Sequence, residues 1–287
     1  MRGRARVDAA PPRRARRGLV ILCGHPGIGA CAHTPLETTF QLGATGIATL
    51  ALVGVVAFAA SILGGLSGYG TGLVVPIVLA PVVGVANVIP VMALAMVINN
   101  SSRVIAFARD IDWPRARRVL AIGLPACVAG AYGYTLLEAR WIAFALGAFL
   151  IASVPLRRLL KQRDRRLSER GLALASAGFG FVNGAMTGAG VLLISTLMAA
   201  GVHGAALIAT DAVVSVVMGL AKIAVFGSLA RLDADLTLAG LLIGACTAPG
   251  AFIARWLLQR IPGRVHTAFM EAIVVTGGAG FVWRAFA

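Results

Sequence analysis

Several polar and charged residues of this chain lie inside long apolar segments, where they are costly and usually face a cavity or a partner. Asn99 and Arg103 stand one helical turn apart near 88–108, and Asp211, Ser215 and Lys222 stand near 206–228. The spacing i, i+4, i+11 places these last three on one helix face. Arg103 and Lys222 could therefore supply positive charge to a path for anions. The alternative is that both side chains snorkel to the interface and bind lipid headgroups.

Asp211 has three open roles: it could balance a cation, take up a coupling proton, or lie near the membrane interface. Lys222 follows it on the same helix face at a distance of about 16 Å, at 1.5 Å per residue. We therefore expect no direct pair between the two residues.

A second set of candidates consists of glycines, which destabilise a helix by about 1 kcal/mol each relative to alanine. The pattern Gly64-x3-Gly68-x-Gly70 recurs 120 residues later as Gly184-x3-Gly188-x-Gly190, and each copy precedes a short apolar segment. One interpretation is close helix packing. The other is a break whose following helix N-terminus attracts anions. On the second interpretation, the substrate-binding residues of the clusters are Gly68, Gly70, Thr71, Gly72, Gly188 and Gly190.

The composition favours a membrane protein. Of 287 residues, 59% are hydrophobic and 13% are charged, against about 25% charged in soluble domains. The net charge of +15 comes from cations between the apolar segments, as positive-inside loops require. No pattern of aromatic residues accompanies these cations, so we expect no nucleic-acid partner. We predict an all-α polytopic protein of the cell membrane, in bacteria the inner membrane.

The elements that must position these residues form two similar halves. We expect ten apolar segments, near 45–65, 70–86, 88–108, 117–137, 141–157, 172–187, 190–204, 206–228, 236–258 and 267–286. Besides the glycine clusters, Ile111-Asp112 matches Leu232-Asp233 and Gly123 matches Gly244. The chain is thus expected to contain two homologous repeats of about five segments each, 45–157 and 172–287.

The orientation of the second repeat depends on how many segments cross the membrane. Five crossings per repeat would invert the second repeat relative to the first, an architecture that recurs in transporters. The alternative has eight spans, with the two glycine-led segments re-entrant, and the distribution of cations fits both. Outside the repeats, 158–171 is expected to be a basic cytoplasmic connector. Residues 1–44 are expected to be an Arg-rich tail or a signal-like segment.

The glycine-rich opening followed by Leu73-Val74-Val75-Pro76, its second copy and the Asp-terminated third segment together resemble the sulfite exporter TauE/SafE family over about 45–287. The resemblance implies a multi-pass permease for sulfur-containing anions such as sulfite, thiosulfate or sulfonates. Two features depart from the family pattern. Thr71 stands where a third glycine is common, and the second copy lacks a proline after Val191.

These observations predict a secondary transporter of small anions that works by alternating access between the repeats. The expected partners are a small anionic substrate, a coupling proton or cation, and the lipid bilayer. We expect no enzymatic activity, no cofactor and no metal. The alternatives are an intramembrane enzyme, for which no HExxH motif is present, and an ion channel. Gly68-Tyr69-Gly70 resembles a potassium filter but lacks the Thr-Val that should precede it.

Overall fold

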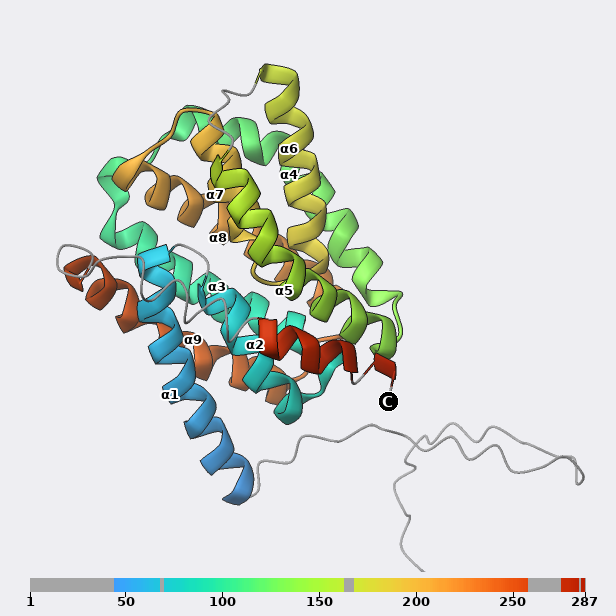
Figure 1. Ribbon diagram of the computed structural model, residues 1–287. Coiled ribbons are helices and arrows are strands. Elements are labelled where there is room, and N and C mark those ends of the chain that lie inside the picture. The colour runs from blue at the N-terminus through green and yellow to red at the C-terminus, as the bar shows by residue number, and fades with distance from the viewer. Residues whose placement is uncertain (1–43, 68–69, 163–167, 258–274, 284, 287) are drawn as a thin grey trace, which may run out of the picture. The chain divides into compact units, whose positions relative to one another are not determined.

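Helices make up all the regular secondary structure in the described part of the chain, as the all-α prediction requires. The computed structural model describes residues 44–67, 70–162, 168–257, 275–283 and 285–286. The predicted tail and Gly68 lie outside these ranges. The helices, shown in Figure 1, are α1 (Ala44–Ser67), α2 (Gly70–Val83), α3 (Val85–Ala106), α4 (Trp113–Thr135), α5 (Ala139–Gln162), α6 (Glu169–Ala185), α7 (Gly190–Ala199), α8 (Gly204–Ser228) and α9 (Ala234–Leu257), with a 3₁₀ turn η1 (Ala108–Asp110) and a further helical stretch at 275–283.

Four of the described helices are long and apolar enough to cross a membrane: Val85–Ala106, Ala139–Leu156, Gly204–Ser228 and Ala234–Ala254. Large apolar side chains also lie on the surface, such as Val55, Leu174 and Trp283, which are 65–75% exposed. Such exposure is unfavourable in water and favourable in lipid. The chain is therefore a polytopic membrane protein.

The two glycine-led helices are short, with 14 residues in α2 and 10 in α7. They span about 21 Å and 15 Å at 1.5 Å per residue, against about 30 Å of hydrocarbon. The seventh segment was expected to reach residue 204, but α7 ends at Ala199 because Gly201 adopts φ 86°, which breaks the helix. Val75 and Leu79 of α2 are fully buried, so this helix packs within the protein.

The described residues at both ends of the predicted connector, 158–171, are helical. Helix α5 continues to Gln162, and α6 begins at Glu169. Ser168 caps α6, because its hydroxyl accepts a hydrogen bond from the amide of Gly171, and Glu169 favours the positive helix end. Helix continuation and capping therefore extend regular structure into both ends of this basic segment.

Helices α3 and α8 lie against each other and run in opposite directions. Arg103, near the end of α3, contacts Asp211, near the start of α8. Earlier in α3, Val97 Cγ2 lies 2.5 Å from the position that a Cβ on Gly219 of α8 would occupy. Later residues of one helix therefore meet earlier residues of the other.

Helix α9 runs parallel to both α3 and α1. In each pair, residues that come later in one helix meet residues that come later in the other. The contacts are Leu94 with Gly240 and Ile98 with Gly244 for α3 and α9, and Gly54 with Cys246 and Ser61 with Gly250 for α1 and α9. Hence α1, α3 and α9 share one direction.

Helix α4 runs parallel to α6 and to α8, and therefore antiparallel to α1, α3 and α9. Its contacts with α6 are close because glycines lie at the interface, and a Cβ there would meet backbone of the other helix. The contacts are Gly123 with Ser176 and Gly130 with Ala185 for α6, and Asp112 with Thr210 and Cys127 with Met218 for α8. Figure 1 shows α4 beside α6.

Two aspartates at matching positions of the halves begin α4 and α9. Asp112 Oδ1 accepts a hydrogen bond from the amide of Arg115 at 3.1 Å, and Asp233 Oδ1 accepts one from the amide of Leu236 at 2.8 Å. Both are N-caps that satisfy an amide three residues ahead. Asp112 and Asp233, which were matched in the sequence, therefore both serve as helix N-caps.

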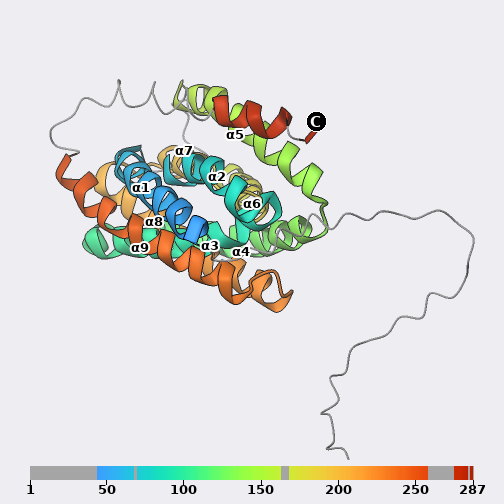
Figure 2. The same ribbon diagram turned by 90° about the horizontal axis from the view of Figure 1, so that it is seen from below.

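The helical stretch at 275–283 packs against α5, as Figures 1 and 2 both show. A Cβ on Gly147 of α5 would lie 2.7 Å from the carbonyl oxygen of Gly278. The two backbones therefore approach closely through glycine.

Candidate anion-binding site

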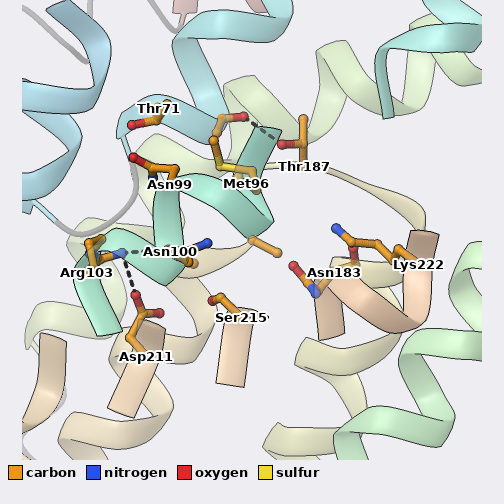
Figure 3. A pocket seen from close by; sticks show the side chains of 15 residues that line it. Thr71, Met96, Asn99, Asn100, Arg103, Asn183, Thr187, Asp211, Ser215 and Lys222 are labelled. Carbon is orange, nitrogen blue, oxygen red and sulfur yellow. Dashed lines mark hydrogen bonds and ion pairs between the residues drawn. The ribbon is translucent and has the colours of Figure 1, made fainter. Parts of the chain in front are cut away.

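A cavity of about 60 Å³ lies where α2, α3, α6, α7 and α8 meet. One water needs about 10–15 Å³, so the space suits several waters or one small polyatomic ion. Nine residues proposed from the sequence line this one cavity: Thr71, Gly72, Asn99, Arg103, Gly188, Gly190, Asp211, Ser215 and Lys222 (Figure 3). Gly70 is the first residue of α2, next to Thr71, and Gly68 lies outside the described residues.

The two glycine clusters meet at the edge of the cavity. The Thr187 hydroxyl donates to the carbonyl of Gly72 at 3.2 Å. A Cβ on Gly72 would lie 2.9 Å from both Cα and N of Gly188. Gly188 itself has φ 81°, a conformation that glycine adopts without strain. The paired pattern in the sequence therefore corresponds to direct packing of one cluster on the other.

Both short helices begin at the cavity. Thr71 and Gly72 belong to the first turn of α2, and Gly190 is the first residue of α7; all three line the space. The first amides of a helix have no partner within the helix, and its N-terminus carries partial positive charge. No side chain caps α7 at Ala189. Two helix starts thus add positive potential to the cavity.

Arg103 and Asp211 form a buried ion pair at one end of the cavity. They are 5% and 1% exposed, and Arg103 Nη1 lies 3.0 Å from Asp211 Oδ2. The same Nη1 also donates to Asn100 Oδ1 at 3.1 Å. Within the described part of the chain, Arg103 Nε and Nη2 and Asp211 Oδ1 have no hydrogen-bond partner. The pair is held by one nitrogen, and two guanidinium nitrogens remain unused.

Lys222 lies at the other end of the cavity, beside Asn183, as Figure 3 shows. It is 6% exposed, and its ammonium donates to the backbone carbonyl of Asn183 at 3.1 Å. Asn183 is in the last turn of α6, where carbonyls lack helical partners and the helix end is negative. None of the ion pairs among the described residues includes Lys222. Neither Lys222 nor Arg103 extends to the surface, as snorkelling would require.

Ser215 lies between the two charged ends, and Asn99 lies beside Thr71 (Figure 3). Ser215 follows Asp211 by one turn on α8, and Asn99 precedes Arg103 by one turn on α3, as their spacing predicted. With Arg103, Lys222 and Asp211 ionised, the side chains of the cavity carry a formal charge of +1. Its polar groups and helix starts favour an anion.

Six further residues line the cavity that the sequence-based set did not include: Met96, Asn100, Asn183, Thr187, Ala189 and Gly219. Asn183 is a polar residue within an apolar segment, which is the signal that identified Asn99. Thr187 lies within the second glycine cluster. Both could have been found from the sequence, whereas Met96, Ala189 and Gly219 carry no polar signal.

No curated protein and no solved structure matches the chain. The family described as sulfite exporter TauE/SafE matches over residues 53–281, which is most of the chain. This match confirms the resemblance seen in the glycine-rich motifs. The chain therefore belongs to the sulfite exporter TauE/SafE family, a family of membrane transporters.

Proposed function

We propose that this protein is a secondary transporter of small anions in the cell membrane, in bacteria the inner membrane. The observation that carries the proposal is a small cavity between two buried cations, Arg103 and Lys222, at which two helices begin. A buried cation without a partner is costly, and a bound anion would offset that cost. A neutral or cationic solute would leave the charge of Lys222 unbalanced.

The substrate class is sulfur-containing anions such as sulfite, thiosulfate or sulfonates. The family supports this class. The cavity is compatible with it, because a compact ion with several acceptor oxygens can reach donors on opposite walls. Among the described residues, Arg103 has two guanidinium nitrogens without a hydrogen-bond partner, and the ammonium of Lys222 has three hydrogens with one partner.

Transport is proposed to proceed by alternating access between two inverted repeats. Under the repeat, α1 to α4 correspond to α6 to α9. The packing supports this correspondence. Helix α1 packs on α9, and its counterpart α6 packs on α4, the counterpart of α9. In the same way α3 packs on α9, and its counterpart α8 packs on α4. Equivalent helices such as α3 and α8 run in opposite directions, as inversion requires.

The helix directions also favour five segments per repeat over a re-entrant second segment. Helices α1 and α3 run in the same direction, so the chain must run back from the end of α1 to the start of α3. Helix α2 is the segment that runs back. Thr71 Oγ1 donates to the carbonyl of Ala60 at 3.2 Å, so α2 begins beside the last third of α1. A re-entrant α2 would instead leave α1 and α3 antiparallel.

The proposal is tested with the full chain purified and reconstituted into liposomes. Uptake of radiolabelled thiosulfate, sulfite and methanesulfonate is measured, with acetate as a carboxylate for comparison. We expect saturable uptake of at least one sulfur anion and exchange with the same anion inside. The variant Lys222→Met should lose uptake, and Arg117→Gln, which removes an exposed cation of α4, should retain it.

Two outcomes would contradict the proposal. Flux that rises linearly with concentration, without exchange, would indicate a channel. Absence of saturable uptake for every anion tested would contradict anion transport altogether.

A further inference from the structure

We propose that Asp211 is the proton-coupling site of this protein, which takes up a proton when a doubly charged anion binds between Arg103 and Lys222. Anion and proton would then cross the membrane together. This inference rests on the proposed anion transport and adds the identity of the coupled ion and its site.

The first argument is the incomplete geometry of the Arg103–Asp211 pair. A guanidinium and a carboxylate can form two parallel hydrogen bonds. Here only Nη1 contacts Asp211 Oδ2, at 3.0 Å, and this nitrogen is shared with Asn100. Asp211 Oδ1 has no partner among the described residues, although the side chain is nearly completely buried. The pair can therefore exchange partners within the cavity, Arg103 to an anion and Asp211 to a proton.

The second argument is the charge of the occupied cavity. Arg103, Lys222 and ionised Asp211 sum to +1, so a single negative charge on the substrate neutralises them. A dianion would leave −1 in a buried space, which is costly. Protonation of Asp211 restores neutrality. One proton per dianion is the stoichiometry that these three side chains favour.

The third argument concerns the groups around Asp211. Arg103 of α3 is the one charged side chain in ion-pair contact with it in the described ranges. From α4 and η1, Asp112 is paired with Arg115, and Arg109 and Asp110 are exposed. Helix α7 has no charged residue, the charged residues of α6 lie at its distant start, and Lys222 is about 16 Å along α8. Among the described residues, Asp211 is the one carboxylate that lines the cavity.

A metal cation fits this position less well than a proton. Metal cations in proteins need several oxygen ligands, and Asp211 Oδ2 is already occupied by a guanidinium that repels a cation. A proton requires only the one free oxygen, Oδ1. We therefore assign the coupled ion as a proton.

The test uses thiosulfate as the probe, because it keeps both negative charges across the neutral pH range. Proteoliposomes of the full chain are given an acidic exterior while the membrane potential is held at zero. One coupled proton permits up to about tenfold accumulation per pH unit of gradient. We expect this accumulation in the wild type. Asp211→Asn should lose it, and Asp235→Asn, which changes an exposed carboxyl of α9, should behave as wild type.

A second measurement does not depend on the folding of a variant. A pH-sensitive dye inside wild-type proteoliposomes should report proton entry with thiosulfate but not with methanesulfonate, which carries one charge. Accumulation driven by a sodium gradient, or by an acid gradient in Asp211→Asn, would overturn the coupling while leaving anion transport intact. Absence of wild-type uptake of thiosulfate, sulfite and methanesulfonate alike would overturn the proposed function itself, and this inference with it.

Discussion

The two ends of the cavity hold the same formal charge in different settings. Arg103 and Lys222 occupy positions of the two halves that match within one residue. Arg103 contacts a carboxylate, whereas the one hydrogen bond of Lys222 among the described residues goes to a backbone carbonyl at the end of α6. The positive charge at the Arg103 end is thus balanced within the protein. The charge at the Lys222 end has no ion-pair partner among the described residues and is where an anion contributes most.

The chemistry of the two side chains fits this difference. A planar guanidinium can keep a carboxylate on one nitrogen while offering others to a ligand, whereas an ammonium is a compact point charge. Arg103 is therefore suited to a position where partners are exchanged. Lys222 is suited to attract charge directly. Four experiments can break or sharpen this comparison.

The largest effect is expected from Arg103→Gln. It leaves the Asp211 carboxylate buried without its cation, which costs about 3–5 kcal/mol of stability. Thermal unfolding of the purified protein in detergent measures the loss. The double variant Arg103→Gln with Asp211→Asn should recover most of it, because neither charge then remains. Equal stability of the single variant and wild type would show that the pair does not hold the fold.

In contrast to Arg103→Gln, Lys222→Met should have a large effect on anion binding and a smaller effect on stability. A charge-assisted hydrogen bond contributes about 1.5–3 kcal/mol, so affinity for thiosulfate should fall about 10- to 100-fold. Calorimetric titration measures the affinity. A stability loss as large as that of Arg103→Gln would abolish the distinction between the two ends.

Gly72→Ala tests the contact between the glycine clusters, which lies beside both ends. The new Cβ would meet backbone of Gly188 at 2.9 Å, and such overpacking costs about 1–3 kcal/mol. Gly178→Ala is the matched control, since nothing lies within 4 Å of its Cβ position on α6. Unfolding temperatures should fall for the first variant and hold or rise for the second. Equal values would mean that the clusters are not in tight contact.

The smallest effects are expected at the two matching N-caps. Asp112→Ala and Asp233→Ala should each cost about 1 kcal/mol. Asp112 should cost slightly more, because its carboxylate also pairs with Arg115 at 2.6 Å. Denaturation of both variants gives the difference. A cost at only one position would indicate that the aspartates do not play equivalent parts in the two halves.

The residues of the cavity were largely predictable, because polar residues in apolar segments are few and are costly unless they face a cavity or a partner. The same holds for glycine clusters repeated at a fixed spacing. Both signals are local or periodic, so they can be read along the chain. Thr71, Asn99, Ser215 and Lys222, which were chosen on these signals, line the same cavity.

The pairing of these residues was not predictable to the same degree. Arg103 and Asp211 are 108 residues apart, and the sequence left three roles open for Asp211. Asn183 supplies its backbone carbonyl to Lys222, and a carbonyl has no signature in a sequence. The early end of α7 depends on the positive φ of Gly201, which glycine permits but does not require. Tertiary packing decided all three.

The exchange of helices between the halves has a consequence for biogenesis. Helix α1 packs against α9, yet residues 68–233 are synthesised between them. Because the N-terminal part of a chain is made first, α1 enters the bilayer long before its partner exists. Helix α4, in contrast, meets α6 soon after the connector emerges. Until α9 is made, α1 can pack on α2, its neighbour in the chain, but its interface with α9 stays open to lipid. That interface closes only after the last third of the protein has been translated.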